Sequence, residues 1–343
     1  MELTFKQNNG PADTLIQQLI DLVDGIHRPE IVREMIIASL KAGQEDDKGV
    51  DLKLMNTSLK EMRFTAKAFG PYRHIKKVTV FGSARTRPDE TPFKMAYDLG
   101  KMLSESGYMV ITGGGPGIMQ AAHEGAGPDY SFGVNIRLPF EQKANPVIER
   151  DPKNINYKYF FNRKIAFLKE SDAIVLFPGG FGTQDEAMET LTLVQTGKRN
   201  PVPIIFMDDP EDKYWTGWMN FMKGKLLSRG YISESDLALF EIVDSAHTAV
   251  QIINRFYSRY HSLRYIGDLL VIRLSSPMSE KKVKEVRDRF SDILRPKGKM
   301  VLSGPLPEES NEPESSNLSR LIIDFKRENF GRLRELIDVI NGG

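Results

Sequence analysis

The sequence predicts an α/β protein with a Rossmann-like, doubly wound parallel sheet, a helical N-terminal extension and a small C-terminal α+β unit. Two observations carry this prediction. Short apolar runs alternate with helical segments from residue 75 onward, and two glycine-rich turns each follow an apolar run and open a helix. Strand, helix and strand in that order imply a right-handed crossover, and strands that are apolar on both faces fit a sheet covered on both sides.

The first 74 residues are predicted to form helices. Apolar residues recur there every three or four positions, as in Leu15, Leu19 and Leu22, and later Ile31 and Met35. This spacing places them on one face of a helix. We therefore expect residues 1–74 to be a helical extension that precedes the sheet.

The central domain is predicted over residues 75–262. Its first strand is expected at residues 78–81 and its second at 108–111, with a helix over 95–103 between them. Later strands are expected at residues 132–136, 173–177, 202–206 and 241–243. Helical patterns separate these runs, which favours a parallel sheet.

Residues 263–343 are predicted to form a separate small α+β unit. Its strands are expected at residues 269–274, 299–302 and 318–325, and its helices at 280–294 and 330–340. The segment 305–317 reads PLPEESNEPESSN, which is acidic and rich in Pro and Ser. Such a composition buries little apolar surface, so the segment is expected to be mobile.

Composition narrows the class of protein. Of the 343 residues, 40% are apolar and 27% are charged, and no apolar run approaches the roughly 20 residues that span a bilayer. The first ten residues lack the basic start and apolar stretch of a signal peptide, and cysteine is absent, so a cytoplasmic protein without membrane partners is expected. A net charge of +1 argues against a nucleic-acid partner.

The first glycine-rich turn contains Gly113, Gly114 and Gly115 and directly follows the predicted strand at residues 108–111 and Thr112. Glycines let a phosphate approach the backbone, and the N-terminus of the following helix favours an anion. We therefore predict that these three glycines bind phosphate. The spacing fits neither the dinucleotide fingerprint nor the Walker A motif. The alternative is a tight turn without a ligand.

The second turn, residues 178–186, reads PGGFGTQDE and also joins an apolar run to a helix. The residues predicted to bind phosphate here are Pro178, Gly179, Gly180, Gly182 and Thr183. Thr183 is also a candidate helix cap. Glu186 comes about one turn later, near enough to reach a ribose hydroxyl or a water molecule. Because Thr183 and Glu186 have Thr-x-x-Glu spacing, a capping box is the alternative.

Two adjacent cations, Arg163 and Lys164, lie at the start of a helix that precedes the strand expected at residues 173–177. Positive charge at a helix N-terminus opposes the helix dipole, so an anion or carboxylate partner is indicated. For Lys164 alone, a solvated charged face remains the alternative. Both residues are predicted to belong to the site, with Lys164 among the phosphate-binding groups.

Arg163-Lys164 followed by PGGFGTQDE closely resembles the Lonely Guy family of cytokinin-activating phosphoribohydrolases, whose signature is PGGxGTxxE. Phe81-Gly82-Ser83 and the sequence GGGPGIM extend the resemblance to roughly residues 75–261. It implies that Arg163 and Glu186 are catalytic. The residues that it adds to the substrate crevice are Gly82, Ser83 and Arg85. The family has also been labelled "possible lysine decarboxylase", but no lysine here suggests a pyridoxal phosphate Schiff base.

The resemblance implies hydrolysis of the N-glycosidic bond of a nucleoside 5′-monophosphate, which releases the free base and ribose 5-phosphate. Breaking this bond builds oxocarbenium character on the ribose, which a carboxylate stabilises while it orients water. About 74 extra N-terminal residues and about 80 C-terminal ones distinguish the chain from short family members. These terminal additions leave open whether the substrate is AMP, another purine or pyrimidine monophosphate, or a cytokinin riboside monophosphate.

A non-catalytic nucleotide- or cofactor-binding protein of the same fold, either a carrier or a nucleotide-sensing scaffold, is the alternative function. The presence of both Arg163 and Glu186 favours the enzyme, since phosphate binding alone needs only the glycines and Thr183. No cofactor is expected, and no metal, because the five histidines are scattered.

A homodimer or higher homo-oligomer is expected from the resemblance, since Lonely Guy proteins pair around the PGGxGTxxE turn. The helix over residues 185–195 supports this expectation, because Met188, Leu191 and Val194 make it apolar over a wide surface. The alternative is that the N-terminal helices cover this surface within the same chain.

Overall fold

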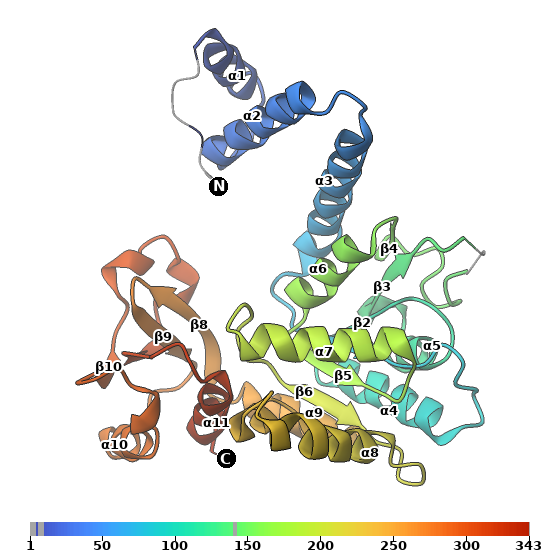
Figure 1. The fold of residues 1–343 in the computed structure, drawn as a ribbon, viewed down its shortest axis with the longest axis vertical. Helices are drawn as coiled ribbons and strands as arrows, with labels where there is room; N and C mark the ends of the chain where they lie inside the picture. Colours follow the sequence, from blue (N-terminus) through green and yellow to red (C-terminus); the bar gives the residue numbers. More distant parts are fainter. Residues whose placement is uncertain (1–4, 6–9, 140–142, 343) are drawn as a thin grey trace. The chain divides into compact units, whose positions relative to one another are not determined.

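The computed structural model describes residues 5, 10–139 and 143–342, and its contacts divide the chain into two compact units, residues 1–64 and 65–343. In the first unit, α1 (Pro11–Asp21) and α2 (Pro29–Glu45) are followed by α3 (Val50–Phe69), which continues past the division (Figure 1). Ile16, Ile20 and Ile37 form the small core of this unit. The N-terminal region is thus helical, whereas the boundaries at 74/75 and 262/263 stay predictions.

The second unit is built on a parallel sheet, to which the described residues contribute seven strands in the order β4-β3-β2-β1-β5-β6-β7. The strands are β1 (Lys77–Phe81), β2 (Met109–Thr112), β3 (Ser131–Ile136), β4 (Asn154–Tyr157), β5 (Ala173–Leu176), β6 (Ile204–Met207) and β7 (Glu241–Val243). The sequence analysis missed β4, whose residues Asn-Ile-Asn-Tyr carry no continuous apolar run. The strand order reverses between β1 and β5, and this is where doubly wound sheets bind ligands.

Helices cover both faces of this sheet (Figure 1). One apolar cluster packs the strands against α4 (Thr91–Glu105), α5 (Ile118–Ala126) and α9 (Ala246–Phe256). The opposite cluster includes α6 (Phe160–Glu170), α7 (Phe181–Gln195) and α8 (Tyr214–Phe221). Short helical turns complete this part of the chain: η1 (Gly70–Tyr72), η2 (Pro128–Tyr130), η3 (Met222–Leu226), η4 (Leu227–Arg229) and η5 (Glu234–Leu239). The predicted Rossmann-like fold is confirmed.

The C-terminal part of the second unit contains an antiparallel sheet, with four described strands in the order β10-β11-β9-β8. Its elements are β8 (Tyr260–Ile266), β9 (Leu269–Leu274), α10 (Glu280–Arg289), η6 (Ser291–Ile293), β10 (Met300–Ser303), η7 (Pro307–Glu309), η8 (Pro313–Ser315), β11 (Ser319–Ile323) and α11 (Phe330–Ile340). The sequence analysis missed β8, whose polar and apolar residues are mixed. The α+β character of this region is confirmed.

The acidic segment 305–317, which was expected to be mobile, is instead anchored on this sheet. Arg273 and Arg320 are paired across β9 and β11, and both donate to the buried Glu309 carboxylate, at 2.6 and 3.0 Å. Burial opposes ionisation of Glu309, but the Leu306 N–H and the two guanidinium groups outweigh it and lower its pKa to about 2. The expectation was wrong because composition does not reveal an ion-pair partner that lies on another strand.

Helices α4 and α5 meet backbone to backbone through two glycines. A Cβ atom at Gly100 would lie 2.1 Å from the carbonyl oxygen of Ala122, and one at Gly125 would lie 1.9 Å from that of Tyr97. This contact fixes α5, and α5 follows the first glycine turn. The close approach therefore supports the shape of the ligand edge.

We expect Gly100→Ala to lower the free energy of unfolding by about 2–3 kcal/mol, because the added methyl group must push two helices apart. Gly217→Ala is the matched control, since a Cβ atom at that position in α8 meets nothing within 4 Å. This control should be neutral or stabilising by up to about 1 kcal/mol. Urea denaturation measures both, and equal effects would contradict the packing argument.

Candidate active site

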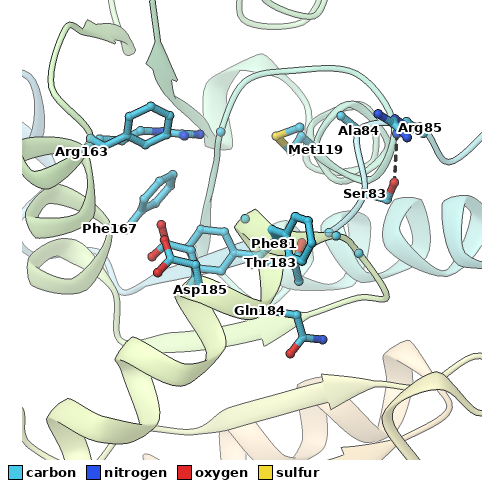
Figure 2. Close-up of a pocket in the computed structure, with 18 of the residues that line it drawn as sticks. Phe81, Ser83, Ala84, Arg85, Met119, Arg163, Phe167, Thr183, Gln184 and Asp185 are labelled. Atoms are coloured by element: carbon cyan, nitrogen blue, oxygen red, sulfur yellow. Dashed lines mark hydrogen bonds between the residues drawn. The ribbon is translucent and has the colours of Figure 1, made fainter. Parts of the chain in front are cut away.

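A cavity of about 710 Å³ lies at the carboxyl ends of β1 and β5, where the strand order reverses. Figure 2 shows Ser83, Arg163 and Thr183 among the residues that line it. Its walls come from the segment after β1, the first glycine turn, α5, α6 and the second glycine turn. The lining residues that the sequence analysis had named are Gly82, Ser83, Arg85, Gly113, Arg163, Gly179, Gly180, Gly182, Thr183 and Glu186. Parallel strands bring these distant segments to one edge.

The second glycine turn opens α7. The helix begins at Phe181 with Gly180 as its N-cap, and the N–H groups of Thr183 and Gln184 both donate to the Gly180 carbonyl at 3.1 Å. Thr183 therefore lies inside the first turn and is not the cap, which excludes the capping-box alternative for Thr183 and Glu186. The first N–H groups of a helix have no intrahelical partner, so this turn suits an anion.

Several contacts hold this turn in shape. The Tyr214 hydroxyl donates to the Gly179 carbonyl at 2.7 Å, and the Ser83 N–H donates to the Pro178 carbonyl at 3.1 Å. A Cβ atom at Gly179 would lie 2.2 Å from the Thr183 hydroxyl oxygen. Pro178 does not belong to the described cavity lining; its carbonyl ties the turn to the segment after β1, and its predicted contact with phosphate stays a prediction.

The first glycine turn is hydrogen-bonded to other residues of the same chain. Among its predicted phosphate-binding residues, only Gly113 belongs to the described cavity lining. The Gly114 N–H donates to the Thr112 hydroxyl at 2.9 Å, and the Asn145 side-chain amide donates to the carbonyls of Gly114 and Gly115 at 3.1 Å. These bonds give Gly114 and Gly115 a structural role in the turn, and their predicted phosphate-binding roles stay predictions.

Gly113 admits the Arg163 side chain. A Cβ atom at Gly113 would lie 2.5 Å from Arg163 Nη2. The guanidinium donates through Nε to the Val134 carbonyl at 2.8 Å, and its carbon lies 5.1 Å from the centroid of the Phe167 ring. Burial lowers the pKa of Arg163, while the Glu186 carboxylate opposes this effect. Gly113 thus leaves room for a cation held at the cavity wall.

Glu186 is a buried carboxyl group beside two cations. Its side chain is 11% exposed, Oε1 lies 3.6 Å from Lys164 Nζ, and Oε2 is buried and has no hydrogen-bond partner among the described residues. Burial raises its pKa to about 7, against the opposing effects of Lys164 and Arg163. A carboxyl group in this range can hold or release a proton at neutral pH.

Lys164 does not belong to the described cavity lining. Its ammonium group pairs with Asp185 at 2.8 Å and Glu189 at 2.5 Å, besides the longer contact with Glu186. Helix α6 places Lys164 opposite the acidic start of α7, so its partners in the structure are carboxylates, and its predicted phosphate contact stays a prediction. The argument from the helix dipole pointed correctly to an anionic partner.

Part of the cavity lining was not predicted from the sequence. Phe160 and Phe167 stand three residues before and four after Arg163, so the helical spacing of α6 carries a signal for both. Met119 lies in the first turn of α5 and was readable in the same way. Tyr214 reaches the site from α8 with no local signal. Within the described ranges, no group of three or more His, Cys, Asp or Glu side chains suits a metal ion.

Fold and site together define a Rossmann-like protein with a cavity suited to an anion at the reversal point of its sheet. Residues 115–253 match the family model described as "Possible lysine decarboxylase". The chain is 28% identical over 188 residues to a cytokinin riboside 5′-monophosphate phosphoribohydrolase of Arabidopsis thaliana, which covers 53% of this chain and 81% of that protein. These similarities support the resemblance of the central part of the chain to the Lonely Guy family.

A second relative and a solved structure resemble the same region. A cytokinin riboside 5′-monophosphate phosphoribohydrolase of Oryza sativa subsp. japonica is 29% identical over 186 residues, covering 52% of this chain and 72% of that protein. The molybdenum cofactor binding protein of Rippkaea orientalis is 22% identical with a TM-score of 0.36, covering 52% of this chain and 96% of that one. No helix within the described part of the chain is long and apolar enough to cross a membrane.

We expect Glu186→Gln to stabilise the protein increasingly as pH rises. The pKa of Glu186 is about 7 in the folded protein against an ordinary 4.5, so the folded state binds more protons between these values. Its contribution to stability therefore falls across this window, by up to about 3 kcal/mol at pH 8. Urea denaturation of wild type and variant at pH 5 and pH 8 measures the difference.

Glu124→Gln serves as the control for this measurement, because Glu124 is an exposed carboxyl group on α5. Because this position is exposed, its substitution should change the free energy of unfolding little. A Glu186→Gln effect that is constant between pH 5 and pH 8 would contradict the raised pKa.

Proposed function

We propose that the protein is a phosphoribohydrolase that cleaves the N-glycosidic bond of a nucleoside 5′-monophosphate to give the free base and ribose 5-phosphate. The observation that carries the proposal is the joint presence of the Arg163 guanidinium and the Glu186 carboxyl group in a cavity that opens on the N-terminus of α7. A phosphate-binding turn and a titratable carboxyl group in one cavity are what this hydrolysis needs.

In this mechanism the first turn of α7 binds the 5′-phosphate. The N–H groups of Gly180 and Gly182 at the start of α7, with the Thr183 hydroxyl, suit a dianion there. The ribose then extends toward Glu186, which lies one turn further along the helix. Remote binding of the phosphate positions the sugar for reaction, so free nucleosides are expected to be poorer substrates.

The chemical step breaks the C1′–N bond and joins a water oxygen to C1′. Negative charge on Glu186 stabilises the positive charge that develops on the ribose, and the same carboxylate accepts a proton from the attacking water. The departing base takes up one proton, which balances the reaction. Arg163 lies on the cavity wall where it can pair with the phosphate or with the leaving base.

The names of the two plant relatives support a phosphoribohydrolase. The cavity lining does not select one base. The candidate substrates are therefore AMP, other purine or pyrimidine monophosphates and a cytokinin riboside monophosphate. The proposal includes a cytoplasmic location, no cofactor or metal, and no membrane or nucleic-acid partner. A carrier or nucleotide-sensing scaffold of the same fold is the outcome that remains if nucleotides bind without turnover.

The test is incubation of the purified protein with nucleoside mono-, di- and triphosphates and free nucleosides, with chromatographic detection of free base. We expect release from a monophosphate and a loss of at least about a hundredfold in kcat for Glu186→Gln, because the lost charge acts chiefly in the transition state. Nucleotide affinity, measured by calorimetry, should be retained. Glu124→Gln is the control.

Binding without turnover of any nucleotide in the wild-type protein would overturn the enzyme and favour the carrier or scaffold. Unchanged turnover in Glu186→Gln would remove that residue from the mechanism.

We further propose a homodimer that buries the surface around the mouth of the cavity. Phe181 is 96% exposed at the first residue of α7, and the exposed apolar side chains nearby on α6 and α7 are Phe160, Phe161, Ile165 and Met188. Large apolar side chains exposed on neighbouring elements often mark a protein–protein interface. Pairing by twofold symmetry would bring each patch against its copy.

We expect Met188→Asp to dissociate the dimer, because a charge buried in an apolar interface loses its hydration. Light scattering across a concentration series, paired with base release, measures assembly and activity together. Val301→Asp is the control, since Val301 is also exposed but lies on β10, in the C-terminal sheet. A wild-type monomer of 38.9 kDa with full activity would contradict the shared-interface proposal.

A further inference from the structure

The packing of α6 against α7 places one ammonium group among three carboxyl groups. Lys164 on α6 faces Asp185, Glu186 and Glu189 on α7, and its Nζ lies 2.8, 3.6 and 2.5 Å from their nearest oxygens. The lysine side chain is only 18% exposed. Three acids share a cation that is largely removed from water.

The three carboxyl groups differ in their access to solvent. The side chain of Asp185 is 61% exposed and that of Glu189 is 33% exposed, whereas that of Glu186 is 11% exposed. The two better-hydrated carboxylates nevertheless have the shorter contacts with Lys164. Glu186 is thus the group that loses most water and receives the weakest direct pairing.

Charge counting shows what this arrangement does to Glu186. The charged groups that act on it are Lys164 and Arg163 on α6 and Asp185 and Glu189 on α7. With every acid ionised, the five side chains carry one excess negative charge. The least hydrated carboxyl group is the one that takes up a proton most readily, which singles out Glu186.

We propose that Lys164 is a positioning residue that sets how readily Glu186 holds its proton, and that Asp185 and Glu189 tune this by competing for the same ammonium group. The inference rests on the proposed function, in which Glu186 accepts a proton from the attacking water. It assigns to Lys164 the control of the proton on Glu186. Lys164 acts through Glu186 and need not touch the substrate.

Removing the cation and removing one of the competing acids are expected to shift the titration of Glu186 in opposite directions. Removing the ammonium group leaves Glu186 with Arg163 as its remaining cation, so it keeps its proton to higher pH. Removing the charge of Glu189 deletes a like charge and frees Lys164 to approach Glu186, so the proton leaves at lower pH. Loosened packing between α6 and α7 would move both variants in the same direction.

The experiment is a carboxyl-carbon NMR titration of Glu186 in protein with labelled glutamate, assigned by the signal that Glu186→Gln removes. We expect the midpoint to rise by about one pH unit in Lys164→Met and to fall in Glu189→Gln. Lys164→Arg keeps the positive charge and should stay near wild type. An unchanged midpoint in Lys164→Met, or shifts of the same sign in both variants, would overturn the proposal.

The titration reads Glu186 whether or not the protein hydrolyses nucleotides, so it separates this inference from the proposed function. If base release is observed, the pH profile of kcat should move with the midpoint in each variant. A Lys164→Met variant that raises KM for the monophosphate with no shift in the profile would make Lys164 a phosphate ligand instead. If Lys164→Met does not fold, Glu189→Gln and Asp185→Asn carry the test. The inference is overturned if the midpoint of Glu186 moves downward in neither variant.

Discussion

A buried carboxyl group beside two cations ties the chemistry of this site to the packing of α6 against α7. Glu186 is removed from water by the same contact that brings Arg163 and Lys164 near it. If α6 moved away, the carboxyl group would regain water and lose its cations together. Its raised pKa therefore depends on helix packing as much as on any single neighbour.

The glycines of the site serve different purposes at different positions. Gly179 lets the Thr183 hydroxyl approach the turn, and Gly113 leaves space for the Arg163 guanidinium. Gly114 has a φ of 72°, a backbone conformation that favours glycine, and its N–H donates to the Thr112 hydroxyl. A glycine-rich turn is thus shaped by side chains that approach from other elements, besides any ligand.

A buried cation, Arg334, connects the C-terminal part of the second unit to the parallel sheet. Arg334 on α11 is almost fully buried, lies 3.1 Å from carboxylate oxygens of Glu241 on β7 and of Asp338, and has its guanidinium carbon 5.0 Å from the centroid of the Phe256 ring. Such an ion pair leaves an uncompensated buried charge if one partner is removed. The two sheets are thereby held as parts of one compact unit.

The sequence by itself determined the alternation of strands and helices, both glycine turns and the pairing of Arg163 with Glu186 as candidates, because these features depend on local periodicity and short motifs. It did not show β4 or β8, whose residues become strands through pairing with neighbours. Only the tertiary structure decided that Lys164 faces carboxylates, that Asn145 engages Gly114 and Gly115, and that Glu309 is anchored by two arginines. Each of these contacts joins residues on different elements, so the physical partner exists only once the chain has folded.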